Sequence, residues 1–247
     1  MFVDSHCHLT FTQFDEDRGE VIERAVKSDV LIVNSIVSPL EVDDGLKFLR
    51  DFDNVYSTLG LSASCLDDGE VEETINLIRQ MREEIVGLGE VGLDYYWVKG
   101  EGERAVLKEN FGKFIELSKE VDLPLVVHSR DAEADCIKML EKHDKPALMH
   151  CFSGRLEQAL NAIELGCLIS IPTNVVYVKK RQELAGEIPV ESLVLETDAP
   201  YLSPTPKTRN EPINVVKAAQ KIAEIKGISV EEVEDSTTEN AKKFFRI

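Results

Sequence analysis

Short runs of apolar and β-branched residues recur along the chain, with segments of helical period between them. Most of these runs are continuously apolar instead of alternating with polar residues, as in parallel strands that are covered on both faces. The pattern predicts eight strands, at residues 2–4, 30–36, 55–61, 85–89, 123–127, 147–149, 168–171 and 193–195.

The segments between the strands carry apolar residues three and four positions apart, so each segment can pack one face of a helix onto a sheet. Gly166 follows one such stripe at the position of a helix C-cap, and Pro124 opens the strand that follows another. The two clearest stripes consist of Leu156, Ala159, Leu160 and Ile163, and of Leu107, Phe111, Phe114 and Ile115.

Strands alternating with helices predict parallel βαβ units and an α/β fold. A single closed (β/α)8 TIM barrel accounts for the number of strands better than a doubly wound open sheet, which is the alternative. Because no repeat or linker interrupts the pattern, we expect residues 1–247 to form one domain. The most loop-like stretch spans 199–212 and follows the last strand, where a barrel carries its active site.

The composition excludes several classes of protein. With 43% hydrophobic and 30% charged residues, the chain can bury a core and does not resemble a disordered protein. Its 28 Lys and Arg against 46 Asp and Glu leave a formal charge of -18, which argues against coating nucleic acid or an anionic membrane through a broad basic face. A small metal-centred or locally positive site is compatible with that charge.

The five cysteines are widely spread and show no C-x-x-C spacing, so neither a disulfide framework nor a zinc knuckle is indicated. We expect reduced thiols in a cytoplasmic protein. The N-terminal residues resemble no signal peptide, and no apolar run approaches the ~20 residues of a membrane span. Cys7 and Cys151, each beside a histidine, are expected to point to the opposite strand face and to serve packing.

Four of the five histidines lie at the ends of predicted strands, which packing alone does not explain. His6 and His8 follow the first strand, His128 the fifth and His150 the sixth. On an extended strand the side chains of His6 and His8 leave on the same face and can bind one ion. His143 lies among charged residues at a helix end, so we assign it to the solvated surface.

Glu90 and Asp198 end the fourth and eighth predicted strands, so both carboxylates face the same rim as the histidines. Taken singly, Glu90 is compatible with a cap or a surface acid, and Asp198 with a turn former before Pro200. Imidazoles and carboxylates together suit divalent ions, and a carboxylate can bridge two of them. Six ligands predict a binuclear site with ions about 3.5 to 4 Å apart, where Asp198 could also accept a proton from the attacking water.

Five blocks of sequence contain these residues, in an order that runs from end to end of the chain. They are Ser5-His6-Cys7-His8, Gly89-Glu90-Val91-Gly92-Leu93-Asp94-Tyr95, His128-Ser129-Arg130, His150-Cys151-Phe152-Ser153-Gly154 and Glu196-Thr197-Asp198-Ala199-Pro200-Tyr201-Leu202. Together with Arg209-Asn210-Glu211-Pro212 and the segment 240–245, these blocks resemble the signature motifs of the TatD family.

The resemblance implies a metal-dependent deoxyribonuclease on an amidohydrolase-like TIM barrel. Its cofactor would be two divalent metal ions, among Zn, Mn, Mg, Co and Ni, and its substrate would be DNA. The ligand set that the resemblance implies is His6, His8 and Asp198 for a first metal, His128 and His150 for a second, and Glu90 as the bridge between them.

One block departs from the family pattern. Where the family usually reads G-x-H-P after the third strand, this chain has Gly60-Leu61-Ser62-Ala63. The missing histidine would lie beside the metals and near the substrate phosphate. Ser62 at that position therefore leaves the ligand set intact but bears on the rate of DNA cleavage or on the choice of substrate.

Two arginines are candidates for phosphate recognition. Arg130 lies two residues beyond His128, on the same side of an extended chain, and its planar guanidinium suits a phosphate or a carboxylate. An ion pair of Arg130 with Asp131 or Glu133 is the alternative. Arg209 lies in the proline-rich loop, where anchoring of that loop is as plausible a role as binding phosphate.

Tyr95, Tyr96 and Trp97 follow the Glu90 strand directly, where rings could stack on the bases of a single strand of DNA. A local hydrophobic cover is the alternative for such an aromatic triplet. Tyr95 is the aromatic candidate for substrate contact.

We therefore expect a cytoplasmic metal-dependent hydrolase that cleaves phosphodiester bonds of DNA, acting on single strands or ends because the acidic surface gives weak general affinity for duplexes. An amidohydrolase, lactonase or ester-type deacylase using the same centre is the first alternative, because one metal cage supports both chemistries. A non-catalytic metal-binding or partner-binding protein is the second. Glu90 and Asp198 count against it, because a scaffold would not require both carboxylates.

Overall fold

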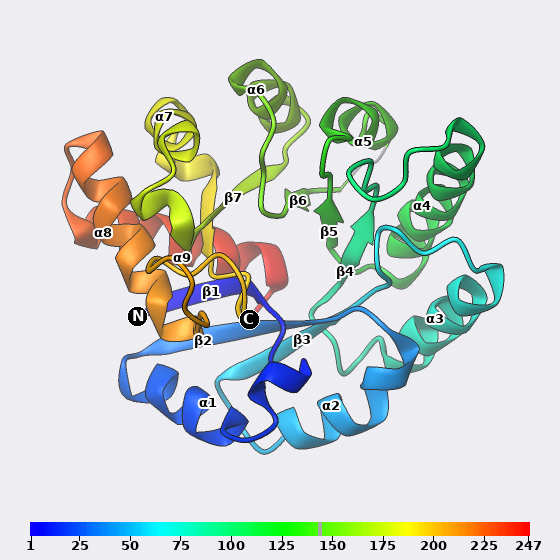
Figure 1. The fold of residues 1–247 in the computed structure, drawn as a ribbon, viewed down its shortest axis with the longest axis horizontal. Helices are drawn as coiled ribbons and strands as arrows, with labels where there is room; N and C mark the ends of the chain where they lie inside the picture. Colours follow the sequence, from blue (N-terminus) through cyan, green and yellow to red (C-terminus); the bar gives the residue numbers. More distant parts are fainter. Residues whose placement is uncertain (143–144) are drawn as a thin grey trace.

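The computed structural model describes residues 1–142 and 145–247, so His143 lies outside the described residues, and it confirms the eight predicted strands (Figure 1). Neighbouring strands pair in parallel, and their spatial order is their order along the chain. The strands are β1 (Phe2–Cys7), β2 (Val30–Ile36), β3 (Val55–Leu59), β4 (Gly87–Gly92), β5 (Leu125–His128), β6 (Ala147–Met149), β7 (Leu168–Pro172) and β8 (Leu193–Glu196).

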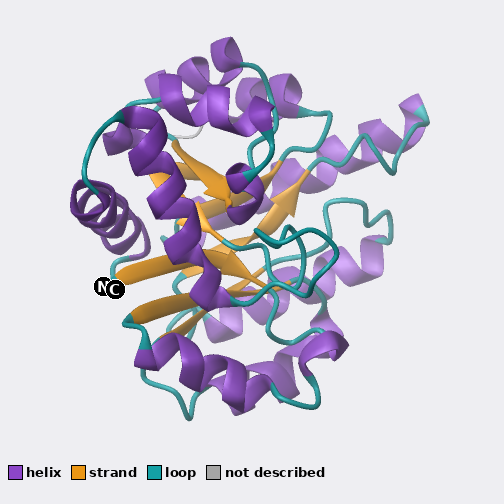
Figure 2. Ribbon diagram, turned by 60° about the vertical axis from the view of Figure 1, so that its left-hand side comes forward, coloured by secondary structure: helices purple, strands orange, loops and turns teal. Residues whose placement is uncertain are grey.

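Helices surround the strands on the outside (Figures 1 and 2). The two apolar stripes of the sequence fall in α4 and α6, and Gly166 follows α6 with a left-handed φ of 83°, as its C-cap position predicts. The helices are α1 (Arg18–Lys27), α2 (Val42–Leu49), α3 (Asp68–Met81), α4 (Glu101–Val121), α5 (Glu133–Leu140), α6 (Leu156–Glu164), α7 (Lys179–Glu187), α8 (Val215–Lys226) and α9 (Val230–Phe245).

The last strand returns beside the first. At their carboxyl ends the backbone N–H of Asp198 donates to the carbonyl oxygen of His6 at 2.9 Å, and the N–H of His8 donates to that of Ala199 at 2.7 Å. The eight parallel strands with helices between them thus form a (β/α)8 TIM barrel, and the open-sheet alternative does not apply.

Two glycines determine the path of β4. Gly89 and Gly92 have φ values of 146° and 145°, and a Cβ atom would lie 2.5 Å from the carbonyl oxygen of Val126 at Gly89 and 2.1 Å from that of His128 at Gly92. Only glycine fits such a close approach to β5. The strand continues to Gly92 instead of ending at Gly89 as predicted, so Glu90 lies within β4.

An apolar layer fills the barrel interior near the amino ends of the strands. Helix α9, which lies behind the strands in Figure 1, packs over this layer. The layer consists of Val3, Val33, Val126, Leu148 and Val194 together with Ala241, Phe244 and Phe245 of α9. The N-terminal residue also lies at this end, where the carbonyl oxygen of Met1 accepts a hydrogen bond from Thr238 of α9. Among the described residues, no helix has the length and apolar character needed to cross a membrane.

Candidate metal centre

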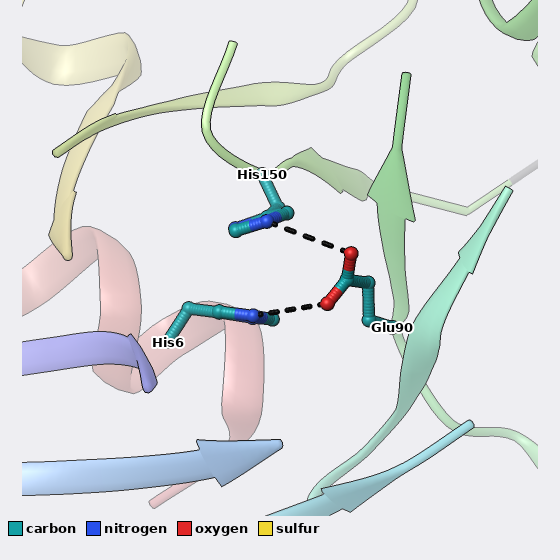
Figure 3. Close-up of side chains that lie close together, drawn as sticks. All are labelled: His6, Glu90 and His150. Carbon is teal, nitrogen blue, oxygen red and sulfur yellow. Dashed lines mark ion pairs between the residues drawn. The ribbon is translucent and has the colours of Figure 1, made fainter. Parts of the chain in front are cut away.

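The six predicted ligands converge at the carboxyl ends of the strands. Glu90 lies at the middle of the group: its Oε2 is 3.3 Å from Nε2 of His6, and its Oε1 is 3.7 Å from Nε2 of His150 (Figure 3). The same Oε1 lies 2.5 Å from Nδ1 of His128. Strands β1, β4 and β5 and the turn after β6 therefore direct four side chains at one point.

His8 and Asp198 complete the group from the ends of β1 and β8. Nε2 of His8 lies 3.2 Å from Nε2 of His6 and 3.5 Å from Oδ1 of Asp198, so the two histidines of the first strand share a face as predicted. Asp198 has a left-handed φ of 55°, which turns its carboxylate toward β1 as the chain leaves β8. Asp and Asn tolerate this backbone conformation better than most residues.

The donor atoms fit divalent cations. Two sets of three ligand atoms, from His6, Glu90 and His150 and from His6, His8 and Asp198, each lie within 4.8 Å of one another. Nδ1 of His128 is buried and has no hydrogen-bond partner among the described residues, although it lies beside the Glu90 carboxylate. An orphaned buried imidazole nitrogen next to a carboxylate is the chemistry of an ion site.

The electrostatics of this centre require positive charge. Burial alone would raise the pKa of Glu90, but the imidazoles of His150 and His128 outweigh it and hold that pKa well below its usual value. Burial likewise opposes protonation of His128, yet Glu90 and Asp94 raise its pKa to about 10. The carboxylates also raise the pKa of His150 to about 9, whereas burial lowers the pKa of His6. In the metal-free chain protons on His128 and His150 therefore offset the carboxylates, and a bound divalent ion would replace those protons.

The histidines of the centre are oriented by further carboxylates that the sequence did not single out. Asp94 lies 3.1 Å from Nε2 of His128, which leaves Nδ1 of that ring for the centre, and the backbone N–H groups that follow Asp94 hold its other oxygen. Glu196 lies 2.9 Å from Nδ1 of His150 and accepts a hydrogen bond from Ser170 at 2.7 Å. Carboxylates placed in this way fix the tautomer and orientation of metal-binding histidines.

Two cavities meet at the centre and share His128, His150 and Asp198 in their walls. The larger, of about 960 Å³, extends over the loops after β5, β6 and β8 to the start of α7, and the smaller, of about 360 Å³, extends toward the ends of β2 and β3. Cys151 lines the larger cavity, so the prediction that it points to the opposite face is wrong. The reason is that the residue lies beyond the end of β6 with a left-handed φ of 47°, which breaks the alternation of a strand.

Arg130 lines both cavities, and no carboxylate of the described residues pairs with it. Its guanidinium carbon lies 3.7 Å from the ring centre of Tyr96, a cation–π contact that holds the charge at the cavity wall. The alternative of an ion pair with Asp131 or Glu133 therefore does not describe its contacts. Trp97 lines the cavities beside Tyr96 and is 66% exposed.

Two predicted substrate-binding residues lie away from the cavities. Tyr95 is buried and donates its hydroxyl to Asp135 at 2.6 Å, whereas the aromatic side chains that line the larger cavity are Tyr96, Trp97 and Tyr201. Arg209 forms a bidentate pair with Asp17 at 2.6 and 2.7 Å and also pairs with Glu211. These contacts anchor the proline-rich loop to the segment before α1, which was the alternative role for Arg209.

Ser62 lines the smaller cavity beside the candidate ligands, as the position of the missing histidine predicts. Its hydroxyl lies 3.1 Å from that of Ser64. This wall of the centre is therefore small and neutral. On the opposite wall the sequence missed Lys180 and Arg181, which line the larger cavity from the first turn of α7.

Comparison with known proteins matches nearly the whole chain to one family. The family described as TatD related DNase matches residues 3–246. A protein of Methanocaldococcus jannaschii named an uncharacterized metal-dependent hydrolase is 40% identical over 99% of this chain and 97% of its own length, and human deoxyribonuclease TATDN3 is 33% identical over 98% and 94%. The crystal structure of YJJV, a TatD homologue from Escherichia coli, superimposes with a TM-score of 0.91 at 25% identity, covering 100% of this chain and 98% of that one.

A TIM barrel whose strands end in converging histidines and carboxylates fits the metal-dependent hydrolases after which the relative is named. Within that class, this chain belongs to the TatD family.

Proposed function

We propose that the protein is a cytoplasmic deoxyribonuclease that hydrolyses phosphodiester bonds, with residues 1–247 acting as one catalytic domain. The observation that carries the proposal is the convergence of four histidines and two carboxylates on one point at the carboxyl mouth of the barrel. The description of the family as TatD related DNase and the name of the human relative support DNA as the substrate.

The ligand atoms divide between two ion positions, with Glu90 in reach of both. When bound, two divalent ions, among Zn, Mn, Mg, Co and Ni, would supply an activated water and neutralise charge on the attacked phosphoryl group. His6, His8 and Asp198 would hold one ion and His128 and His150 the other, with Glu90 within reach of both.

Asp198 is the residue that accepts the proton of the attacking water. Its Oδ1 faces His8 at 3.5 Å, whereas its Oδ2 receives no hydrogen bond from the described residues and the side chain lines both cavities. The buried imidazoles of His8 and His150 outweigh the effect of burial and lower the pKa of Asp198, so it is ionised and ready to act as a base at neutral pH.

The substrate is a single strand or a DNA end. Arg130, held on the face of Tyr96, can donate two parallel hydrogen bonds to the oxygens of the attacked phosphate. Trp97 leaves a ring face in solvent on which a base can stack. A net charge of -18 offers no broad basic face for a long duplex, so only a short segment is held.

A second candidate activity is hydrolysis of a carbonyl ester or lactone at the same centre. Ser62 favours it, because the wall where the family usually places a histidine near the phosphate is neutral here. The fold and the ligand set serve either reaction, so the substrate has to be decided by experiment.

A substrate panel tests the proposal. Protein purified without a His tag is stripped with a chelator, reloaded with Mg, Mn, Zn or Co, and given labelled single-stranded DNA, esters and lactones. We expect DNA cleavage that a chelator abolishes and that at least one metal restores. If the DNA stays intact with every metal while an ester or lactone is turned over, the nuclease assignment is wrong and the second candidate stands.

A further inference from the structure

Three consecutive cations, Lys179, Lys180 and Arg181, form the first turn of α7, and no acidic residue lies in that turn. The amino end of a helix carries the positive end of its dipole. Cations there interact unfavourably with the dipole, whereas acidic side chains are favoured. Three consecutive cations at a helix start are unexpected in a chain in which acidic residues outnumber basic ones and the net charge is -18. A bound anion would reverse the unfavourable interaction.

Arg181 supplies the second, independent observation. Within residues 1–142 and 145–247 no carboxylate lies within ion-pair distance of its guanidinium, whereas most other arginines pair with an acid. Its Nη1 donates to the carbonyl oxygen of Phe152 at 3.2 Å and its Nη2 to the sulfur of Cys151 at 3.3 Å. These contacts fix the guanidinium in the loop after β6 but use only part of its five donors.

Arg181 also lines a cavity that ends at the candidate metal centre. Arg181 and Lys180 line the larger cavity together with His150 and Asp198, but they do not line the smaller one that contains Glu90. Arg130 lines both. A phosphate at the centre is thus within reach of Arg130, and a group bound beside α7 is displaced from the centre into the larger cavity.

We propose that Arg181, with Lys180 beside it, binds a backbone phosphate that flanks the one being hydrolysed. This inference rests on the proposed function, because it assumes a substrate with more than one phosphate. Phosphate is the fitting anion, since a planar guanidinium and an ammonium at a helix start offer charge and several donors to one tetrahedral group. The substrate strand therefore runs from the metal centre over the loop after β6 toward the start of α7 and not toward Ser62.

Two substrates separate a flanking phosphate from the attacked one. Metal-loaded protein is assayed with a single-stranded oligonucleotide and with bis(p-nitrophenyl) phosphate, which contains one phosphodiester and no neighbour. R181Q is expected to raise KM for the oligonucleotide about tenfold or more, because charge-assisted hydrogen bonds are lost. KM for the small substrate should stay within about twofold, because no contact to it is removed.

Matched variants test the other cations near the same cavity. K180Q should raise KM for the oligonucleotide by a smaller factor, R130Q should impair both substrates, and K179Q should change neither, since Lys179 starts the same helix but does not line the cavity. An oligonucleotide KM for R181Q no higher than that of K179Q overturns the proposal. Equal losses on both substrates also overturn it, because they place Arg181 at the attacked phosphate or in a structural role.

Binding distinguishes a failure of this inference from a failure of the proposed function. If the native protein hydrolyses neither phosphodiester, the proposed function fails, but anisotropy of a labelled single strand still reports on Arg181. The slope of log affinity against log salt should be less steep by about 0.7 in R181Q, which is the value for one phosphate contact to a single strand. An unchanged slope, with K179Q as the reference, overturns the inference.

Discussion

The two ends of the barrel interior differ in the polarity of the side chains that fill them. Near the amino ends of the strands, valines and a leucine meet the aromatic residues of α9 in a dry layer. At the carboxyl ends, imidazoles and carboxylates converge near the barrel axis, and Nδ1 of His128 lies against the Glu90 carboxylate without a hydrogen bond from the described residues. The dry end is complete without a ligand and the charged end is not, so stability and function are expected to respond to different substitutions.

The largest effect is expected at the charged end. Asp198→Asn removes the proton acceptor and one candidate ligand but keeps the size of the side chain and a residue that tolerates the left-handed backbone. We expect kcat/KM for the cleaved substrate to fall by about 10² to 10⁴, the usual contribution of a positioned base. Circular dichroism should show an intact fold.

Asp131→Asn is the matched control, because Asp131 lines the larger cavity at a similar φ of 57° but is not among the converging ligands. It should retain most of the activity. Equal activity of the two variants would mean that Asp198 has no special part in the reaction.

Substitutions in the apolar layer should lower stability and leave activity unchanged. Phe245 of α9 is 2% exposed, so Phe245→Ala leaves a cavity and should destabilise the fold by about 3 to 5 kcal/mol. Urea unfolding measures this loss. Metal content and kcat of the folded fraction should be unchanged, because no candidate ligand contacts the layer. Leu40→Ala, at a side chain that is 93% exposed, is the control with little expected effect. A fall in kcat for Phe245→Ala would show that the two ends are coupled.

A smaller effect on function is expected at residues that orient the candidate ligands without being ligands themselves. Glu196 is fully buried and orients His150 through Nδ1. Glu196→Gln should lower metal affinity by about 10- to 100-fold, as loss of such a partner does in other metal sites. Competition with a chromogenic chelator gives the affinity. Ser170→Ala removes the other donor to the same carboxylate and should have the weaker effect; the opposite ranking would reject the orienting role.

The same contrast explains what could be predicted from the sequence. Continuous apolar runs specify the strands because both faces of a parallel sheet are buried, and the ligands at strand ends follow from that placement. Backbone conformations of single residues have no such signal, so the turn at Cys151 and the burial of Tyr95 were missed. Asp94 and Glu196 lay inside recognised blocks, but only the fold shows which histidine each one contacts.

Lys180 and Arg181 show a second limit of prediction. A run of three cations followed by a glutamine and a glutamate has the composition of a solvated helix, and nothing in its spacing relates it to the histidines. The run is identified as part of the site only in the fold, where β7 and α7 place it beside the loop that follows β6. Contacts between segments that are far apart in the sequence, and not the local pattern, reveal residues of this kind.

The smallest expected effect is a pH-dependent one at the dry end. Asp122 accepts hydrogen bonds from Arg246 after α9 and from Lys145, and these cations lower its pKa from 3.8 to about 2. Because the folded-state pKa is the lower one, these two ion pairs of Asp122 stabilise the fold fully above pH 4, and their contribution is lost as the pH falls toward 2. Asp122→Asn should therefore lower Tm slightly at pH 7, and the difference from the native protein should shrink as the pH falls below 4. Asp53→Asn, at an aspartate without an ion pair in the described structure, should show no such trend. A difference in Tm that stays constant with pH would mean that Asp122 acts through packing at the turn and not through its charge.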